Sequence, residues 1–531
     1  MRRGTQIING VEYVYEDCAY WDPAKKRGTH KRNYIGKNVD GKFVPNKKFR
    51  LQMELDAAKA AVKPGPVPAL ECRRTFYGAT YLLNAISEKI GVTQDLKVCF
   101  PDSYHEILSL AYFLVLEENC PLYRFRRWSA THEHPYGRDI PSQRSSELLG
   151  CITEKGKMEF FARQAARRSE KEYLAFDTTT ISSYSQLLKQ AKYGKNKEGD
   201  SLPQLNLALL YGEESGLPVY YRKLAGNIMD VKTVHNLLKD IDFLQMAKVS
   251  LVMDRGFYSE ANINGLFKNH HKFLIGVKKS LKFIRMKLDE IRGDFVSRAN
   301  FNSKTGLYIM TFTMEWNYTE EKPRSKETIS DKRRIYVHFY YNDQRATDEK
   351  NRFNRLLDSL ENELLSGHRT PEHEKQYAKY YAISETQIRG MKLEPKEDAI
   401  RAVEKDYGYF ILMSNGIKDP VKALEIYRSK DTIEKPFGNL KERLNMRRMA
   451  VASEENFEGK LFIQFVALIY LSYIKKVMDE QGLFKNYTMQ ELLDELDIIE
   501  RYQQPGKAYH PGEMTKKQKS LYQYMGVDFP S

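Results

Sequence analysis

The first sixty residues change from the alternation of a β-strand to the period of a helix. Val11–Tyr15 alternates large apolar with polar positions, as the strands of a small β-ribbon do. Leu51–Val62 instead repeats its apolar residues with the period of an α-helix. Residues 64–68, Pro-Gly-Pro-Val-Pro, then predict a stiff linker. We therefore expect an N-terminal β-ribbon/helix module at residues 1–63.

Residues 69–170 follow a helical pattern. Apolar positions recur at helical spacing from Thr80 to about Arg168, most clearly over Ile107–Leu116. Gln143–Thr153 is a further predicted helix, with Ser142 as its N-cap.

From Tyr173 onward, short apolar runs bounded by turns predict an α/β core. A helix is expected around Val231–Leu244. Five strands are predicted at 173–177, 206–211, 217–222, 249–253 and 273–277. Three strands in a meander, followed by helices alternating with strands, indicate an α/β order. We assign residues 171–277 to the first part of this core.

Residues 278–406 interrupt the predicted core with a different pattern of strands and helices. Strands at 307–313 and 334–340 flank a charged loop, and a long polar helix follows at Asp348–Leu365. We interpret this stretch as an inserted α+β subdomain. The core then resumes over 407–480, and residues 481–531 predict a polar helical tail.

Composition favours a polyanionic partner and a reducing compartment. Lys and Arg number 85 against 70 Asp and Glu, a formal charge of +15. Such an excess points first to nucleic acid, although a merely basic protein would also carry it. The five Cys form no C-x-x-C pair, which fits a cytoplasmic protein. No signal peptide is recognised at the start. Leu461–Ile474 is apolar but too short to span a bilayer, so we expect no membrane contact there and a buried helix instead.

Two aspartates stand at the predicted ends of short apolar strands. Asp177 precedes three threonines, whose hydroxyls can hold a carboxylate and its bound water. Asp254 precedes Arg255-Gly256, where the glycine permits a sharp exit into the next helix. A strand-end Asp can also simply cap the following turn. Sites on α/β sheets lie at this edge, which favours a functional role for the pair.

A stripe of aromatic and charged side chains is predicted on a later helix. At 100° per residue, Tyr427, Lys430, Glu434 and Lys441 lie within about a 60° arc. The stripe is either a solvated, ion-paired face or the third part of a metal site. Three carboxylates suit two Mg²⁺ ions about 3.5–4 Å apart, which activate the nucleophile and stabilise the leaving oxygen of a phosphodiester.

At these residues the sequence resembles the DDE transposases of bacterial insertion sequences, and more narrowly the insertion-sequence-four group. The group's signature is Tyr, two residues, Arg, three residues, Glu, six residues, Lys. The chain matches it at Tyr427, Glu434 and Lys441, whereas Lys430 stands where the family has Arg. Lysine keeps the charge but lacks the planar fork for bidentate phosphate contact. Pro436 further predicts a kink just past Glu434 unless the helix begins near Ile433.

Other motifs extend the resemblance over about residues 171–475. They are Gly216-Leu217-Pro218, the run Gly226–Asp230, Asp254–Phe257 and the opening of the late apolar helix at Gly459. The N-terminal ribbon, with Trp21 and Ile35-Gly36-Lys37, is similar to the branch with long N-terminal regions.

The resemblance implies a ribonuclease-H-like (retroviral integrase) core and an enzyme that cleaves and joins DNA. Asp177, Asp254 and Glu434 would be catalytic and bind two Mg²⁺ ions, with Mn²⁺ able to substitute. The substrates would be the double-stranded terminal inverted repeats of a mobile element and its target DNA. A homodimer would pair two ends, in the nucleoid-associated cytoplasm of a bacterium.

Further basic residues are candidates for contact with DNA. Arg447 and Arg448 extend the basic face beyond Lys441, with pairing to nearby glutamates as the alternative. Arg126 and Arg127 lie among aromatic residues, as on nucleic-acid surfaces, although helix-end packing explains them nearly as well. Arg144, on the helix after Ser142, would reach a major groove if that helix reads DNA. His132 and His134 lack companion metal ligands, which favours a loop.

Three rival functions remain open at this point. A nuclease on the same fold would cut DNA without joining it. An inactive or domesticated relative would bind element ends as a repressor. A basic membrane-surface protein would need an amphipathic basic helix with an aromatic face, which the sequence does not display.

Overall fold

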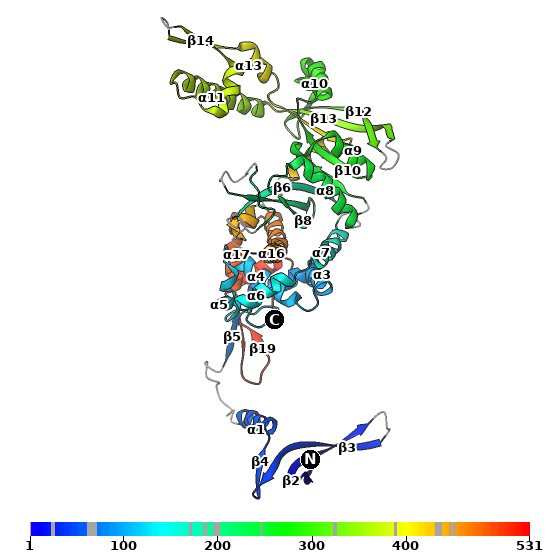
Figure 1. Ribbon diagram of the computed structural model, residues 1–531, viewed down its shortest axis with the longest axis vertical. Helices are drawn as coiled ribbons and strands as arrows, with labels where there is room; N and C mark the ends of the chain where they lie inside the picture. The colour runs from blue at the N-terminus through cyan, green and yellow to red at the C-terminus, as the bar shows by residue number, and fades with distance from the viewer. Residues whose placement is uncertain are drawn as a thin grey trace. The chain divides into compact units, whose positions relative to one another are not determined.

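The computed structural model describes the chain except for a few segments (Figure 1). The described residues are 2–22, 27–60, 72–168, 172–183, 188–194, 202–244, 246, 248–321, 327–386, 390–430, 438–444, 448–449 and 453–530. The chain forms two units: residues 1–75 with 501–512, and residues 76–500 with 513–531.

The first unit contains the predicted β-ribbon. Four strands pair antiparallel in chain order: β1 (Arg2–Ile8), β2 (Val11–Asp22), β3 (Arg27–Val39) and β4 (Lys42–Pro45). Asn9-Gly10 and Asp40-Gly41 form the two-residue turns, with φ of 49° and 78°, and of 50° and 72°. Such dipeptides are typical of hairpin turns because both central residues need positive φ. The helix α1 (Lys47–Ala60) follows.

A second, three-stranded sheet joins segments far apart in the sequence. Its strands are β5 (Arg73–Phe76), β18 (Glu500–Gln503) and β19 (Tyr509–Pro511), in the order β19-β18-β5. The tail that the sequence predicts as purely helical therefore contributes two strands here.

Two apolar helices form the centre of a helical core in the second unit. From Glu106 to its end, every residue of α4 (Tyr104–Leu116) is buried, and α16 (Glu454–Glu480) packs against it. The surrounding helices are α2 (Gly78–Ile90), α3 (Val92–Cys99), α5 (Phe125–Ser129), α6 (Ser142–Cys151), α7 (Glu154–Ala166), α17 (Met489–Asp497) and α18 (Lys516–Tyr524). A helix that is apolar all round must be enclosed, so the N-terminal and C-terminal helices share one core.

The length and composition of α16 alone would allow it to cross a membrane. However, 83% of its most apolar window is buried inside the protein. The buried helix expected around Leu461–Ile474 is therefore part of this interior.

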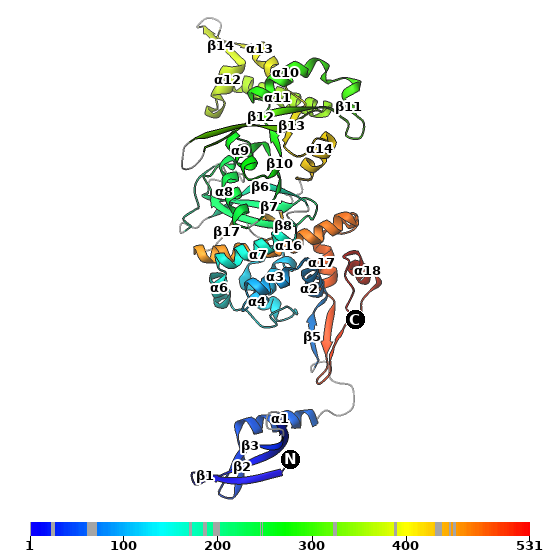
Figure 2. The same ribbon diagram turned by 90° about the vertical axis from the view of Figure 1, so that its right-hand side faces the viewer.

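A ten-stranded sheet is the central element of the remaining part of the second unit (Figure 2). Its order is β11-β12-β13-β16-β10-β9-β6-β7-β8, with β17 beside β6. The strands of the predicted core are β6 (Tyr173–Ser183), β7 (Gln204–Gly212), β8 (Pro218–Ala225), β9 (Ser250–Met253), β10 (Lys272–Val277) and β16 (Tyr409–Ser414). β6, β7 and β8 form an antiparallel meander, and β9 and β10 run parallel to β6.

Three helices are attached to this sheet near its parallel strands. α8 (Asp230–Phe243) connects β8 to β9, and α9 (Glu260–Lys268) connects β9 to β10. α14 (Pro420–Ser429) follows β16 and contacts β9, β10 and β12. Together they confirm the predicted α/β class.

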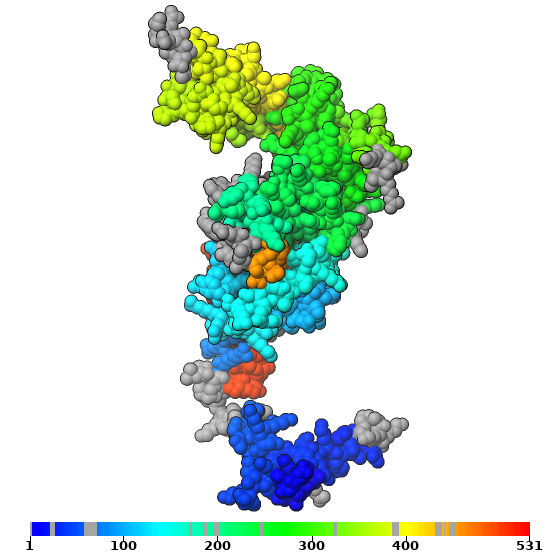
Figure 3. All heavy atoms as spheres, in the orientation of Figure 1, coloured from blue at the N-terminus to red at the C-terminus, as the bar shows by residue number. Residues whose placement is uncertain are grey.

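The predicted insertion 278–406 divides into two parts. α10 (Lys282–Phe295) is followed by strands that extend the central sheet: β11 (Phe301–Asn302), β12 (Leu307–Glu321) and β13 (Thr328–Tyr341). The remainder has its own core around Phe353, Leu360 and Tyr377. Its elements are α11 (Asp343–Leu365), α12 (Glu374–Tyr380), β14 (Tyr381–Thr386), β15 (Gly390–Pro395) and α13 (Glu397–Glu404). These residues form a lobe, yellow in Figure 3.

Two local expectations differ from the structure. Ser142 is the first residue of α6 rather than its cap; the N-cap is Pro141, and no side chain caps this end. The helix predicted to carry residues 427–441 is not one regular α-helix, because α14 ends at Ser429 and residues Asn439–Arg443 form a short π-helix.

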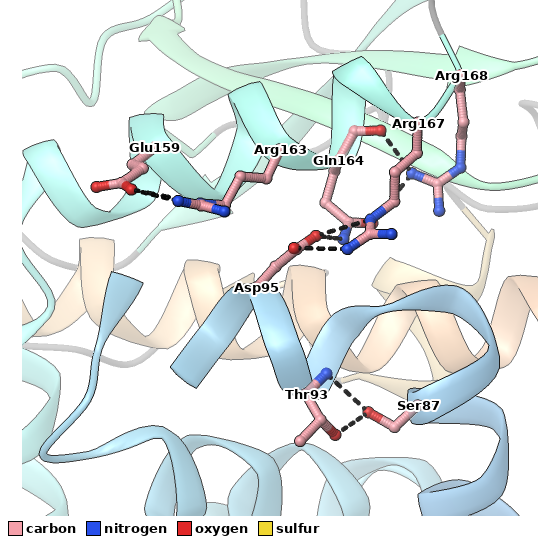
Figure 4. Close-up of polar contacts among 8 residues, drawn as sticks. All are labelled: Ser87, Thr93, Asp95, Glu159, Arg163, Gln164, Arg167 and Arg168. Carbon is pink, nitrogen blue, oxygen red and sulfur yellow. Dashed lines mark hydrogen bonds and ion pairs between the residues drawn. The ribbon is translucent and has the colours of Figure 1, made fainter. Parts of the chain in front are cut away.

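A buried carboxylate joins α3 to α7 (Figure 4). Asp95 is 2% exposed and accepts hydrogen bonds from Gln164 Nε2 at 2.6 Å and from Arg167 Nε and Nη2 at 3.0 and 2.7 Å. A Cβ at Gly91, whose φ is +75°, would lie 2.4 Å from the Arg167 guanidinium carbon. The neighbouring Arg168 is buried and donates to the Gln164 carbonyl at 2.9 Å. These arginines of the helical region therefore serve its packing.

We expect Asp95→Ala to lower the free energy of unfolding by about 2 kcal/mol, because it leaves a buried amide and a guanidinium without their acceptor. The matched control is Glu159→Ala, which breaks the half-exposed pair with Arg163 at 3.1 Å and should change stability by about 0.5 kcal/mol or less. Thermal unfolding followed by circular dichroism measures both. Equal shifts in Tm for the two variants would contradict this account of Asp95.

Candidate active site

Asp177 and Asp254 lie at the same level of two adjacent strands. The parallel register of β6 and β9 ends with the pair Phe176 and Met253, so the two aspartates occupy the next position on each strand. Adjacent strands are about 4.8 Å apart. β6 does not end at Asp177, as the sequence pattern predicts, but continues to Ser183 beside β7. The aspartate therefore lies where pairing with β9 stops.

Short hydrogen bonds orient both carboxylates. The backbone N–H of Thr178 donates to Asp177 Oδ1 at 2.7 Å. The backbone N–H of Arg255 donates to Asp254 Oδ1 at 2.7 Å, and the Tyr427 hydroxyl donates to the same oxygen at 2.8 Å. Asp254 is thus held by its own turn and by a side chain from α14.

A glycine makes room for the tyrosine. Gly276 of β10 follows Ile275, which pairs with Met253 of β9, so Gly276 is beside Asp254. A Cβ at Gly276 would lie 2.7 Å from the Tyr427 hydroxyl oxygen and 3.2 Å from the Arg255 nitrogen. Any larger residue would therefore displace the hydroxyl from the carboxylate.

The charge around Asp254 favours its ionised form. Burial by itself would raise the pKa of Asp254, but the Lys430 ammonium, the Tyr427 hydroxyl and Arg255 outweigh burial and lower the pKa. Lys430 is 8% exposed, and its Nζ lies 5.4 Å from the centroid of the Tyr427 ring. The lysine that departs from the family signature therefore lies against the predicted site.

Asp230 is a further acidic residue, bonded to the threonine that follows Asp177, and sequence reasoning did not assign it to the site. The Thr178 hydroxyl donates to Asp230 Oδ1 at 2.5 Å, and a Cβ at Gly256 would lie 3.8 Å from Asp230 Oδ2. Asn206 Nδ2 donates to the Ile228 carbonyl at 2.8 Å and so holds the segment before α8. The sequence did contain a signal for Asp230, because this residue ends the run Gly226–Asp230. That run was noted only as a motif of the family.

Several predicted site residues are only partly described. Glu434, Pro436 and Arg447 lie outside the described residues. Arg448 is in β17 (Arg448–Met449), which pairs with β6, but its side chain is outside the described part. Lys441 lies on the short π-helix. Their roles in the site stay predictions.

The donors that are described suit a hard divalent cation. Two carboxylates at one level of adjacent strands supply the oxygen ligands that Mg²⁺ prefers. Within the described ranges, no three acidic, His or Cys side chains form a complete metal cluster. The third predicted ligand, Glu434, lies outside those ranges.

The basic residues predicted to contact DNA have different surroundings. Arg144 donates from Nε and Nη2 to the two oxygens of Glu106, both at 2.9 Å, and so joins α6 to α4. Arg126 Nε lies 3.4 Å from Asp139 Oδ2, and the Arg126 side chain is 82% exposed. Arg127 is exposed and lines a cavity of about 380 Å³ with Trp128. DNA contact by these arginines stays a prediction.

The two histidines have protein partners. His132 Nε2 lies 2.9 Å from Asp497 Oδ2, and its ring stacks on Trp128 at 4.7 Å. His134 Nδ1 lies 3.0 Å from the Ser109 hydroxyl, and burial, together with His132, lowers its pKa to about 4. Both therefore hold the loop to the helical core.

Comparison with known proteins places this chain among transposases. The family profile described as Transposase DDE domain matches residues 168–470, which include Asp177, Asp254 and Glu434. The search of curated proteins finds no significant match. Among solved structures, the chain is similar to the piggyBac transposase synaptic complex with hairpin DNA, at 11% identity and a TM-score of 0.34, over 83% of this chain and 72% of that one.

A pre-cleavage Mos1 transpososome is similar at 12% identity and a TM-score of 0.15, over 44% of this chain and 69% of that one. These structural likenesses are too low to carry an argument, so the assignment depends on the family profile. The match covers more than half of the sequence, and the chain belongs to the family of proteins with a transposase DDE domain.

Proposed function

We propose that this protein is an active transposase, which cleaves DNA at the ends of an insertion sequence and joins the freed 3′-hydroxyl strand to target DNA. The observation that carries the proposal is the side-by-side position of Asp177 and Asp254, with Tyr427 bonded to the second. Within this family, such a pair is the part of the site that binds the catalytic cation. The proposal includes Glu434 as the third carboxylate.

Each residue has a separate part in the proposed reaction. Asp177, Asp254 and Glu434 would hold two Mg²⁺ ions, or Mn²⁺ in their place. When bound, the ions would supply a deprotonated nucleophile and stabilise the leaving oxygen. Tyr427 orients Asp254 through its hydrogen bond, and Lys430 keeps that carboxylate ionised. A fully ionised carboxylate binds a cation more strongly than one that is partly protonated.

The finer assignments belong to the same proposal. We assign the β6-β7-β8 meander with β9 and β10 to a ribonuclease-H-like core, and the chain to the long-N-terminus branch of the insertion-sequence-four group. Two copies would pair two terminal inverted repeats in a bacterial nucleoid. The residues proposed to contact DNA are Tyr427, Lys430, Lys441, Arg447, Arg448, Arg126, Arg127 and Arg144.

We expect Asp177→Asn, Asp254→Asn and Glu434→Gln each to reduce DNA cleavage by more than about 100-fold while leaving DNA binding intact. This exceeds the roughly 10–100-fold loss typical of removing a group that only orients a metal ligand. The assay is nicking of a supercoiled plasmid that carries the element's own ends, with Mg²⁺ and with EDTA.

Glu315→Gln is the control, because Glu315 is an exposed carboxylate of β12 that pairs with Lys332. Cleavage that survives one of the three substitutions would exclude that residue as a ligand. Tight end binding without any cutting would favour the repressor. Cutting without joining of pre-cleaved ends to a target plasmid would favour the nuclease.

Tyr427→Phe should slow cleavage by about 10–100-fold and make it more sensitive to acid. The hydroxyl helps to lower the pKa of Asp254, so its loss raises that pKa. Asp254 then becomes protonated at a higher pH, and the acid side of the pH–rate profile moves upward. The profile is measured from initial cleavage rates at fixed Mg²⁺ concentration.

Gly276→Ala should reproduce this loss, because its Cβ would displace the Tyr427 hydroxyl. The double variant Gly276→Ala/Tyr427→Phe should lose no more activity than the worse single variant, since both act through one hydrogen bond. Fully additive losses, or an acid limb that does not move in Tyr427→Phe, would refute this role for the tyrosine.

A further inference from the structure

The start of α8 is held against the central sheet by two buried amide side chains. On one side, Asn206 of β7 donates from Nδ2 to the Ile228 carbonyl at 2.8 Å. On the other side, Asn262 of α9 donates from Nδ2 to the Val231 carbonyl at 2.8 Å. Asp230, the first residue of α8, lies between these two anchored carbonyls. Its backbone is therefore fixed independently of anything that its own side chain does.

The Asp230 carboxylate lies beside the residues that follow both proposed catalytic aspartates. Its Oδ1 accepts the Thr178 hydroxyl at 2.5 Å, a distance typical of a strong hydrogen bond to a charged carboxylate. Its Oδ2 lies 3.8 Å from the position that a Cβ would take at Gly256. Asn262 ties the same two segments together, because its amide also donates to the Phe257 carbonyl at 2.7 Å. One residue of α8 thus borders both strand ends of the site.

Thr178 and Asp177 point to opposite faces of β6. Side chains alternate along a regular strand, and the pairing of β6 with β7 continues without a bulge from Leu174 to Ser182. The Thr178 side chain is 4% exposed and meets Asp230 on the face away from Asp177. Asp230 is therefore placed to act on the site through Thr178 and not as a ligand beside Asp177.

The part of β6 that contains Thr178 is paired on one side only. Pairing with β9 ends at Phe176, and β17 pairs with β6 at Ser182 and Ser183. Between these points, among the described residues, β7 is the only strand beside β6. The Thr178 N–H that donates to Asp177 Oδ1 at 2.7 Å belongs to this stretch. A second restraint on Thr178 therefore fixes the direction of that N–H and of the carboxylate that accepts it.

We propose that Asp230 is a positioning residue of the metal site: through the Thr178 hydroxyl it fixes the backbone N–H that orients Asp177. The inference rests on the proposed function, because it gives Asp230 a part in holding a ligand of the proposed cation. Partners behind a metal ligand set the direction of its lone pairs, and their loss lowers metal affinity or activity by about 10–100-fold.

The test measures Mn²⁺ binding to the full-length protein from the electron paramagnetic resonance signal of unbound Mn²⁺. Asp230→Leu and Thr178→Val each remove one partner of the hydrogen bond and leave a side chain of similar size. Each should raise the Kd for Mn²⁺ by about 10–100-fold. The double variant should lose no more affinity than the worse single variant, because both substitutions break the same bond. If Asp230→Leu does not fold, Thr178→Val alone decides the outcome.

Two conservative variants separate positioning from direct coordination. Asp230→Asn keeps an oxygen that can accept the Thr178 hydroxyl, and Thr178→Ser keeps the hydroxyl. Both should bind Mn²⁺ as the unmodified protein does, whereas Asp177→Asn should not. A loss in Asp230→Asn as large as that in Asp177→Asn would overturn the inference, because it would make Asp230 a ligand itself.

Thr233→Val is the matched control. The Thr233 hydroxyl is also buried and bonds to the same residue, but it donates to the Asp230 backbone carbonyl, at 2.6 Å. Its removal should lower Tm by an amount similar to that in Thr178→Val and leave the affinity for Mn²⁺ unchanged. An equal loss of affinity in the two variants, or no loss in Thr178→Val, would overturn the inference.

Plasmid cleavage and Asp177→Asn separate this inference from the proposed function. Suppose that Asp177→Asn loses Mn²⁺ and the unmodified protein cuts: an unchanged Kd in Asp230→Leu and Thr178→Val then defeats only the role of Asp230. An affinity that depends on Asp230, in a protein that never cuts, supports that role and defeats the transposase. Mn²⁺ binding that survives Asp177→Asn defeats the metal site and, with it, both proposals.

Discussion

In a parallel pair of strands the carboxyl ends meet at one edge of the sheet, and the register of β6 with β9 brings Asp177 and Asp254 to one level there. A slip of one residue would turn one carboxylate to the opposite face, because side chains alternate along a strand. β6 is fixed on both sides, by β9 on one and by β7 on the other. The position of the site therefore follows from the pairing of buried strands rather than from the turns beside it.

Two carboxylates this close repel each other, by about 3 kcal/mol at roughly 5 Å in a medium of effective dielectric near 20. The protein offsets part of this repulsion with the Tyr427 side chain of α14 and with Lys430, the residue that follows the helix. Gly276 is part of this arrangement, because its missing side chain leaves the space that the hydroxyl occupies. The site is thus prepared for a cation by contacts between β9, β10 and α14.

The helical region and the catalytic sheet are built on a common interior. α16 packs against α4 and α6 and also contacts β8, so residues from both ends of the second unit enclose it. The insertion is attached in a similar way: β13 pairs with β16 and β12 pairs with β13, and only the later helices have a separate core. This continuity lets the lobe of the insertion border a cleft that begins at Asp254.

The local pattern of the sequence was sufficient to predict most strands and helices and the α/β class, because periodicity and turn chemistry depend on residues close together in the chain. The family was predicted separately, from the resemblance of its motifs. The local pattern also singled out Asp177 and Asp254 from their positions after apolar strands. It did not predict that β6 continues past Asp177, that β12 and β13 join the central sheet, or that Asp230 lies beside Thr178.

The sequence also did not predict which partners the charged residues bond to. Arg144 bonds to Glu106, 38 positions away, and Asp254 to Tyr427, 173 positions away. Arg167, directly after α7, bonds to Asp95 on α3. The identity of a charged residue does not tell whether its side chain faces solvent, a carboxylate or a ligand. Only the packing of distant segments decides which, since burial and pairing depend on neighbours that the chain brings together when it folds.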